Sequence, residues 1–373
     1  MRVLHYTLTF TDTDIGGQEV LVRVLSEKQT CDSDVAVYTW MKGNLPATEM
    51  LGSVKLIREG PGALGQKNQL VKAVKRLVQV RTDFLFLRDA LKHCDIFHVH
   101  GPTFGWRFPS QNQYILSYDP VRKALQKCKH AKSLVTFHRD FLPKEKPSFI
   151  NEAMTHDAAT SVSSTMAQAL RIRHLPNGVD TKMFKPHEYV NDGSDKVHVL
   201  CPTRITPWKR QLEFVGLVEP LKDRIRIRFT GNFDPQDAYC RAVQRRVEAV
   251  GLDATFTGSL EFSQLPQMYA WADLVALPSK GPEGMPLTAL EASSSSRAVV
   301  AYDVAGTPDI IHAGVNGFLA KTDEEFQAYL TRLVEDKQLR SEMGRKGREI
   351  ALPFDWNEIA SAYNEIYTEL LSS

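Results

Sequence analysis

Apolar and polar residues in the first 170 positions alternate between short apolar runs and longer stretches of helical period. Short runs rich in β-branched and aromatic residues predict buried strands, and apolar residues three or four apart predict amphipathic helices. Strands are expected at Val3–Thr9, Val35–Thr39, Asp95–Val99, Ser133–Phe137 and Ala158–Val162. Helices are expected near Gly17–Glu27, Gln69–Leu91, Pro120–Lys129, Phe149–His156 and Thr165–Leu170. This alternation predicts a parallel sheet with helices on both faces.

The same alternation recurs after a polar segment, Pro186–Asp195, which has no periodicity and predicts a linker. In this second series, strands are expected at Val197–Cys201, Arg226–Thr230, Thr255–Thr257, Leu274–Leu277 and Ala298–Tyr302. A final amphipathic stretch, Trp356–Leu371, follows after the second sheet is complete. The pattern therefore predicts an α/β protein with two doubly wound domains, residues 1–186 and 187–355.

Composition narrows the class of protein. The chain has 373 residues, of which 43% are hydrophobic and 24% charged, which suits two globular domains. A formal net charge of +2 gives no reason to expect a nucleic acid partner. The five scattered cysteines form no C-x-x-C pair, which indicates reduced thiols rather than disulfides or zinc. Neither a signal segment nor an apolar run long enough to span a bilayer is evident, so we expect a cytoplasmic protein.

Two glutamates eight positions apart give the strongest chemical signal. Glu283 and Glu291 flank a Gly-Met-Pro turn that opens a helix, directly after the apolar run Ala272–Pro278. A helix N-terminus at the carboxyl end of a strand offers free N–H groups to a phosphate. Carboxylates on both sides of such a cradle suit a sugar nucleotide, because it carries hydroxyls at both ends. Taken alone, the pair is better explained by two solvated glutamates on a helix.

Basic residues upstream favour the binding interpretation. Arg204 ends the strand-like run that starts at Val197, and Lys209 stands five residues later where the next helix opens. Such a pair is suited to bind a diphosphate, because arginine offers a planar two-pronged donor and lysine offers a mobile point charge. Downstream, Asp303–Asp309 and Ala313–Leu319 form two further turns at element ends.

This combination resembles the retaining GT-B glycosyltransferases, in particular glycosyltransferase family four, the group 1 transferases. The resemblance covers nearly the whole chain and is strongest from Val197 to Leu319. It implies a GT-B fold, in which two doubly wound Rossmann-like domains face a cleft and the C-terminal helix, here 356–373, crosses back to the first domain. The first domain would bind the acceptor, and the second the nucleotide-sugar donor.

The resemblance assigns roles to residues of the second domain. Arg204 and Lys209 would stabilise the leaving diphosphate, and Glu283 would bind hydroxyls of the donor sugar. Glu291 would bind the ribose. Two further groups of residues would bind the donor. The phosphates and sugar would be framed by Gly284, Met285, Pro286 and Leu287. The base would pack against Gly258, Ser259 and Leu260.

In the first domain, the resemblance points to a glycine pair and a histidine. Gly16 and Gly17 follow the first strand and would face the donor phosphates. His138, in a Thr-x-His context at a strand end, would hydrogen-bond the transferred sugar and polarise the reacting centre, and it completes a catalytic set with the residues above. His98 and His100 share one face of a strand. We expect one to pack and His100 to line the acceptor side, and no metal site, since no third ligand stands at suitable spacing.

The chain departs from the family pattern at two turns. The usual Ala-x-Ala-x-Gly is replaced by Ala292–Ser296, which ends in serine. The usual Gly-Gly is Ala305-Gly306, and the usual glutamate nearby is Asp309. These changes are expected to affect packing and turn strain, and they leave the charged set intact.

Two further motifs support alternatives. Gly60–Gly65 matches G-x-G-x-x-G and suggests an NAD-linked oxidoreductase, but it does not follow the first strand, and Pro61 removes a donor. We expect this loop to face the acceptor.

Gln66–Arg81 is a basic amphipathic stretch that could lie on an anionic membrane, making the protein peripheral at its inner face. A helix that packs its apolar stripe and exposes its basic face is the more usual explanation.

The expected reaction is transfer of a sugar, with retention, from a nucleoside-diphosphate sugar to a hydroxyl acceptor on a glycan, a lipid-linked molecule or a small molecule. UDP is the expected nucleotide, because it is the commonest in the resembled family. Front-face substitution would proceed with no cofactor and no metal, because fixed cations replace the ion. An epimerase or a phosphorylase on the same fold is an alternative. Acceptor choice is expected in the loops Asn44–Gly65 and Gly101–Asn112.

Overall fold

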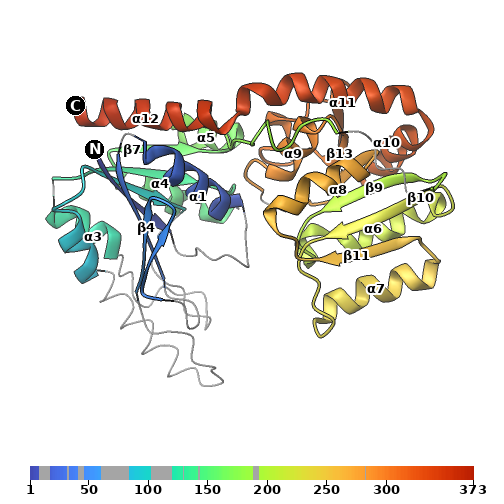
Figure 1. The fold of residues 1–373 in the computed structure, drawn as a ribbon, viewed down its shortest axis with the longest axis horizontal. Helices are drawn as coiled ribbons and strands as arrows, with labels where there is room; N and C mark the ends of the chain where they lie inside the picture. The colour runs from blue at the N-terminus through green and yellow to red at the C-terminus, as the bar shows by residue number, and fades with distance from the viewer. Residues whose placement is uncertain are drawn as a thin grey trace. The chain divides into compact units, whose positions relative to one another are not determined.

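The computed structural model forms two compact units (Figure 1). It describes residues 1–7, 17–31, 33–40, 46–59, 84–101, 120–128, 130–141, 143–187, 193–281 and 283–373. The first unit comprises Met1–Leu175 and Ile359–Ser373, and the second comprises Pro176–Glu358. The residues predicted from the sequence to act at Gly16, Gly60–Gly65 and Gln66–Arg81 lie outside the described residues, as does most of Gly101–Asn112.

The first unit contains an eight-stranded sheet in the order β3-β4-β2-β1-β5-β6-β7-β8. Its strands are β1 (Arg2–Thr7), β2 (Asp34–Trp40), β3 (Thr48–Leu51), β4 (Val54–Glu59), β5 (Ile96–His100), β6 (Lys132–Phe137), β7 (Ala158–Ser161) and β8 (Arg173–His174). Its helices are α1 (Gly17–Gln29), α3 (Pro120–Lys127), α4 (Lys146–Ala153) and α5 (Ser164–Leu170). Every residue of β5 is buried, as expected for a parallel strand covered on both faces.

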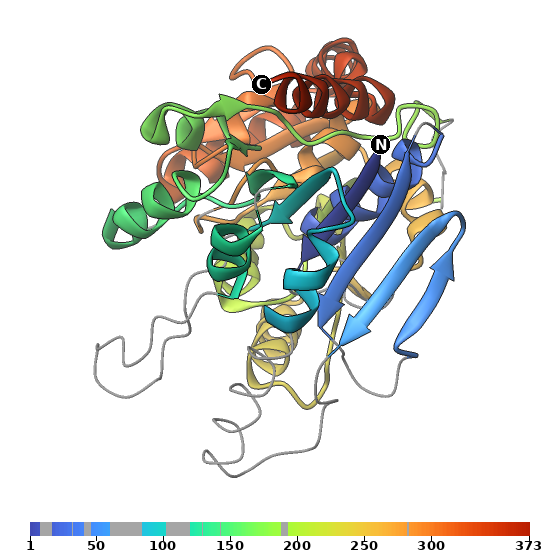
Figure 2. The same ribbon diagram turned by 90° about the vertical axis from the view of Figure 1, so that its left-hand side faces the viewer.

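One edge of this sheet differs from the purely parallel sheet that the pattern predicts. β3 and β4 form an antiparallel hairpin, visible as the light blue pair in Figure 2. The chain reverses through Gly52, whose positive φ of 59° suits a residue without a Cβ. Part of the stretch Asn44–Gly65, interpreted as an acceptor loop, is therefore an edge hairpin.

The second unit contains a six-stranded parallel sheet in the order β11-β10-β9-β12-β13-β14. Its strands are β9 (Val197–Pro202), β10 (Ile225–Thr230), β11 (Ala254–Gly258), β12 (Leu274–Leu277), β13 (Ala298–Tyr302) and β14 (Gly317–Ala320). Its α-helices are α6 (Gln211–Val218), α7 (Ala238–Val250), α8 (Leu265–Trp271), α9 (Leu287–Ser294), α10 (Asp323–Glu335) and α11 (Lys337–Ala351). α6, α7 and α10 share one apolar core with the sheet. On the other face, His198 stacks on Trp271 of α8 at 4.3 Å.

Each sheet has one point at which the strand order reverses. In the second sheet the chain runs outwards from β9 in one direction and from β12 in the other. Ligands of open α/β sheets bind beyond the carboxyl ends of the strands at such a reversal. The loops that follow β9 and β12 are therefore the place to look for a site. In the first sheet, the reversal lies between β1 and β5.

The boundary between the units falls earlier than the polar segment at Pro186–Asp195. Residues from Pro176 belong to the second unit, because their polar groups bond there. Asn177 Nδ2 donates to Met285 O at 2.7 Å, and Ser294 Oγ donates to Phe184 O at 2.5 Å. Backbone packing against these residues, rather than local polarity, sets the boundary.

The C-terminal helix α12 (Trp356–Ser372) starts in the second unit, and its residues from Ile359 onward belong to the first. This confirms the helix that the resemblance predicts to return to the first domain. Tyr363 and Tyr367 are fully buried there, and the hydroxyl of Tyr367 lies 2.6 Å from Nδ1 of His98. In the part of the chain that the structure describes, no helix combines the length and apolarity needed to cross a bilayer.

Two helical glycines give a test of this packing. Alanine has a helix propensity better than that of glycine by about 1 kcal/mol. Around Gly216 of α6, a Cβ would meet nothing within 4 Å, so Gly216→Ala should stabilise the protein by about 0.5–1 kcal/mol. At Gly344 of α11, a Cβ would overlap the carbonyl oxygen of Ser296, so Gly344→Ala should destabilise by about 1–3 kcal/mol. Urea unfolding of both variants checks this; shifts of the same sign would contradict the packing of α11.

Candidate active site

The loop after β9 holds Arg204 in a fixed backbone position. The fully buried Gln211 donates from Nε2 to Thr203 Oγ1 at 2.9 Å and to Arg204 O at 2.8 Å. Gly231, after β10, approaches so closely that a Cβ would lie 2.7 Å from Thr203 O. The Arg204 side chain is exposed and has no partner among the described residues. Its guanidinium is therefore available to an anion.

Lys209 joins this loop to the one after β12. It ends a 3-10 turn, Pro207–Lys209, and its Nζ forms an ion pair with the carboxylate of Glu283. The same Nζ lies 4.1 Å from the centre of the Trp208 ring. Gly281 packs beneath that ring, where a Cβ would lie only 2.6 Å from it. Both members of the ion pair are largely buried, at 13% and 14% exposed, so their mutual geometry is well restricted.

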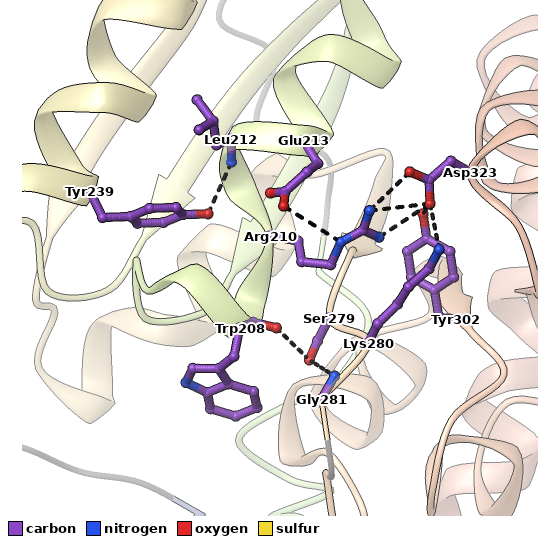
Figure 3. A network of polar contacts seen from close by, with 10 residues as sticks. All are labelled: Trp208, Arg210, Leu212, Glu213, Tyr239, Ser279, Lys280, Gly281, Tyr302 and Asp323. Carbon is purple, nitrogen blue, oxygen red and sulfur yellow. Dashed lines mark hydrogen bonds and ion pairs between the residues drawn. The ribbon is translucent and has the colours of Figure 1, made fainter.

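A second ion cluster joins the loop after β9 and the loop after β12 to the start of α10 (Figure 3). Asp323, the first residue of α10, accepts from Arg210 Nη2 at 2.9 Å, Lys280 Nζ at 2.6 Å and Tyr302 Oη at 2.6 Å. The hydrogen bonds from Arg210 and then Lys280 hold the pKa of Asp323 well below its usual range. Arg210 adopts the left-handed conformation, with φ of 60°. Sequence reasoning missed this cluster, because Asp323 follows the end of a distant strand.

The turn before α9 forms the opposite wall. Gly306 N donates to Gly284 O at 3.0 Å, and a Cβ on Gly306 would lie 2.6 Å from that oxygen. Pro286 caps α9 without a side-chain hydrogen bond. Within the described residues, the backbone N–H groups that lack a partner here are those of Gly284, Met285, Leu287 and Thr288.

These walls enclose a small hollow at the reversal in strand order. Lys209, Glu283, Pro286 and Thr288 line it, together with Thr203, Leu277, Ser279, Ala301, Tyr302 and Thr307. The structure thus brings together two of the predicted catalytic side chains and the start of α9, with Arg204 on the same loop as Lys209. A larger surface hollow of about 620 Å³ lies around α10, away from these residues.

Glu291 lies on α9 and is 8% exposed. Tyr269 of α8 donates its hydroxyl to Glu291 Oε2 at 2.6 Å, and Oε1 has no partner among the described residues. Burial raises the pKa of Glu291 to about 7, although the hydrogen bond from Tyr269 opposes this shift. Sequence reasoning identified Glu291 but missed Tyr269, which orients it.

The turn Gly258–Leu260 ends β11. Gly258 has a φ of 71°, and its carbonyl accepts from Gly231 N at 3.1 Å. Ser259 is exposed and Leu260 is half-buried. Gly231 therefore contacts both this turn and the Arg204 loop. Its place directly after the predicted strand Arg226–Thr230 could have marked it in the sequence.

The family departures fall at strained positions. Ser296 and Ala305 both have positive φ, 58° and 49°, although neither is glycine. These are the places where the resembled family usually has glycine. The departures thus change turn strain, as expected, and neither removes a charged residue from the hollow.

The remaining predicted residues belong to the first unit. Gly17 is the first residue of α1, and His138 directly follows β6. Nε2 of His138 lies 3.2 Å from Nδ1 of His100, whose Nε2 lies 2.9 Å from Nδ1 of His5. His100 is 2% exposed and has protein partners at both ring nitrogens. It is therefore enclosed rather than lining an open acceptor side, and β1 supplies the third histidine that sequence spacing did not reveal.

Comparisons with known proteins agree with the fold. Residues 187–350 match the family model described as glycosyl transferases group 1. The sulfoquinovosyl transferase SQD2 of Arabidopsis thaliana is 30% identical over 56% of this chain and 42% of its own length. The D-inositol 3-phosphate glycosyltransferase of Paenarthrobacter aurescens is 26% identical over 96% of this chain and 94% of its own. The chain thus spans less than half of the first relative and nearly all of the second.

Solved structures extend the likeness to the whole chain. Sucrose-phosphate synthase from Thermosynechococcus elongatus superposes with a TM-score of 0.81 at 19% identity, covering 100% of this chain and 99% of that one. Anabaena HepE in complex with UDP and glucose superposes with a TM-score of 0.72 at 17% identity, covering 99% of both. The strand orders, the returning C-terminal helix and these matches together show that the chain has the GT-B fold, and its residues 187–350 are similar to the group 1 glycosyl transferases.

Proposed function

We propose that the chain transfers a sugar from a nucleoside-diphosphate sugar, with UDP as the nucleotide, to a hydroxyl acceptor with retention of anomeric configuration. One observation carries the proposal. An exposed arginine, a lysine–glutamate ion pair and unpartnered backbone N–H groups meet at the reversal in strand order of the second sheet.

The diphosphate would lie between the Arg204 loop and the start of α9. Arg204 offers a two-pronged cationic donor. The free N–H groups of Leu287 and Thr288 lie at the N-terminus of α9, which is the positive end of the helix dipole. Pro286 supplies no N–H, so its neighbours make the backbone contacts. These fixed donors stabilise the negative charge that develops on the leaving diphosphate.

Hydroxyl recognition would fall to the two carboxylates. Glu283 is held by Lys209 through one oxygen, which leaves the other to accept from hydroxyls of the sugar. Glu291 has one oxygen held by Tyr269 and the other without a described partner, which suits the ribose. The turn Gly258–Leu260 would pack against the base. For Gly16, Gly17 and His138, contact with the phosphates and the sugar stays a prediction.

The chemistry follows from the absence of a dedicated nucleophile in this proposal. A double displacement would need a carboxylate beneath the anomeric carbon, whereas this proposal assigns the free oxygen of Glu283 to the sugar hydroxyls. In front-face substitution, the bond from the anomeric carbon to the diphosphate breaks as the bond to the acceptor oxygen forms on the same face. The acceptor proton passes to a phosphate oxygen of the leaving group. Arg204, Lys209 and the helix end take the place of a divalent ion, so the reaction needs no metal.

The named relatives support this choice of reaction. The second relative is named a D-inositol 3-phosphate glycosyltransferase, and HepE was solved in complex with UDP and glucose. Such names favour a transferase over an epimerase, a phosphorylase or an NAD-linked oxidoreductase. We propose a hydroxyl on a glycan, a lipid-linked molecule or a small molecule as the acceptor. Peripheral membrane contact through Gln66–Arg81 stays a prediction.

A transfer assay tests the proposal. Each UDP-sugar is incubated with a panel of hydroxyl acceptors in EDTA, and the anomeric coupling constant of the product is read by proton NMR. We expect an α-linked product from an α-linked donor without added metal. An inverted product would contradict the mechanism, and conversion of the donor without an acceptor would favour the epimerase.

Removal of the open cation should weaken donor binding. Arg204→Ala should cost about 1.5–3 kcal/mol in the affinity for UDP, the scale of a charge-assisted hydrogen bond, which corresponds to about 10- to 150-fold in Kd. Arg245→Ala is the matched control, because Arg245 is also exposed but lies on α7. Calorimetric titration gives both Kd values. An unchanged Kd in Arg204→Ala would refute its role.

The raised pKa of Glu291 predicts a pH dependence of binding. Ribose hydroxyls donate to the charged carboxylate, so below the folded pKa of about 7 binding must expel a proton. The Kd for UDP-glucose should be flat above pH 7 and rise by about tenfold per pH unit below it. In Glu291→Gln, this dependence should vanish. An equal slope in both proteins would show that another group titrates.

The raised pKa of Glu291 also makes the folding stability of the free protein depend on pH, and here stability falls as pH rises. The unfolded chain releases the Glu291 proton above about pH 4.5, whereas the folded chain retains it up to about pH 7. Glu291 therefore reduces stability as pH rises through this window, and Glu291→Gln should remove that contribution.

The Asp323 cluster should support the site from behind. Asp323→Asn removes the charge that holds Arg210 and Lys280, so the KM for the donor should rise several-fold. The loss of stability should be only about 1 kcal/mol, because the carboxylate is 34% exposed and solvent screens the pairs. Glu335→Gln is the control, since Glu335 ends the same helix and pairs with Arg224 rather than with the residues of the cluster. Equal KM values in the two variants would argue against a supporting role.

A further inference from the structure

A row of buried hydrogen bonds links Gln29 to His138 through two other histidines. Gln29 Oε1 lies 2.9 Å from His5 Nε2, and His5 Nδ1 lies 2.9 Å from His100 Nε2. His100 Nδ1 lies 3.2 Å from His138 Nε2. These residues come from α1, β1, the end of β5 and the position after β6, all within the first unit.

Burial keeps the three rings neutral. It lowers the pKa of His5 to about 4 and that of His138 to about 3, and it lowers that of His100 as well, where nearby histidines add to the effect. A neutral imidazole has one N–H donor and one bare nitrogen acceptor. In a row of such rings, the direction of one hydrogen bond therefore fixes the direction of all the others.

Gln29 sets that direction. Its Nε2 donates to Asn364 Oδ1 at 3.2 Å, which turns its carbonyl oxygen towards His5. A carbonyl only accepts, so His5 must carry its proton on Nε2 and accept at Nδ1 from His100. His100 in turn donates from Nε2 and accepts at Nδ1 from His138.

The last ring is left with one bare nitrogen. His138 uses its only proton, on Nε2, for the bond to His100, and its buried Nδ1 has no partner among the described residues. We propose that Gln29, acting through His5 and His100, locks His138 in the Nε2–H tautomer, so that His138 offers Nδ1 as a hydrogen-bond acceptor to a substrate hydroxyl. This inference rests on the proposed function for the identity of the substrate, whereas the tautomer itself does not depend on it.

A metal site is the competing explanation of the cluster, because ring nitrogens of His5, His98 and His100 lie within 4.8 Å of one another. The facing nitrogens of His5 and His100 are 2.9 Å apart, whereas two nitrogens on a tetrahedral zinc at about 2.05 Å lie about 3.3 Å apart. His98 has both nitrogens engaged, by Tyr367 at 2.6 Å and by Thr136 at 2.7 Å. The spacing thus favours hydrogen bonds between neutral rings.

The consequence is a specific kind of selectivity. A bare nitrogen accepts from a hydroxyl but cannot donate to a carbonyl or an ether oxygen. Gln29, His5 and His100 are positioning residues, since each acts on substrate only through His138. A donor or acceptor sugar that lacks the hydroxyl facing His138 should be a poor substrate.

Nitrogen-15 NMR of the full chain labelled at histidine tests the proposal directly. The wild type should show His138 protonated at Nε2 and bare at Nδ1. In Gln29→Met, His5 loses its acceptor, so the row can reverse and His138 should show a substantial Nδ1–H population. Tyr363→Phe is the control. Tyr363 is as fully buried as Gln29, but its hydroxyl lies 3.4 Å from Thr136 Oγ1 and does not contact the row. Tyr367 would be a poor control, because it lies beside Gln29.

The activity readout separates this inference from the proposed function. Once a substrate is known, Gln29→Met should lower kcat by about tenfold, the scale of one hydrogen bond, with little change in the Kd for UDP. A wild type with Nδ1–H at His138, or an unchanged His138 in Gln29→Met, would overturn the proposal. A shift on addition of zinc at all three clustered rings would also overturn it. The expected tautomers in a protein without transferase activity would refute the proposed function alone.

Discussion

The candidate site depends on how closely the loops after β9, β10, β12 and β13 of the second unit approach one another. Two of these approaches leave no room for a Cβ. Gly231 lies against the carbonyl of Thr203, and Gly306 lies against that of Gly284. The buried amide of Gln211 then fixes the Arg204 backbone. A side chain at either glycine would separate the loops and with them the charges that they carry.

Charge in these loops is arranged so that little of it is left unbalanced. Asp323 and Glu213 together balance Arg210 and Lys280 behind the hollow, and Glu283 pairs with Lys209 at its edge. Among these cations, Arg204 is the one without a described partner, and it stands beside the free N–H groups at the start of α9. An anion is therefore attracted to one place. The pairs of Asp323 hold the loops in position at modest cost in desolvation, because its carboxylate is 34% exposed.

Much of the architecture could be predicted from the sequence. Strands buried on both faces, such as β5 and β12, are continuous apolar runs and fall within one or two residues of prediction, because burial dictates their composition. The β3–β4 hairpin was missed, since its edge strand is exposed and carries no such run. At the site, Arg204, Lys209 and Glu283 stood out by their position at element ends. Asp323, Tyr269 and His5 did not, because each reaches its partners through the folded sheet rather than through local spacing.

We propose that fixed cations and backbone donors of the second unit hold a nucleoside diphosphate without a metal ion. The most direct measurement is calorimetric titration of the wild-type chain with UDP, GDP, ADP and NAD in EDTA, repeated with added Mg²⁺. We predict that one nucleoside diphosphate, UDP, binds with the same Kd in both buffers and that NAD does not bind. Binding of a diphosphate only when Mg²⁺ is present, or binding of NAD alone, would contradict the account.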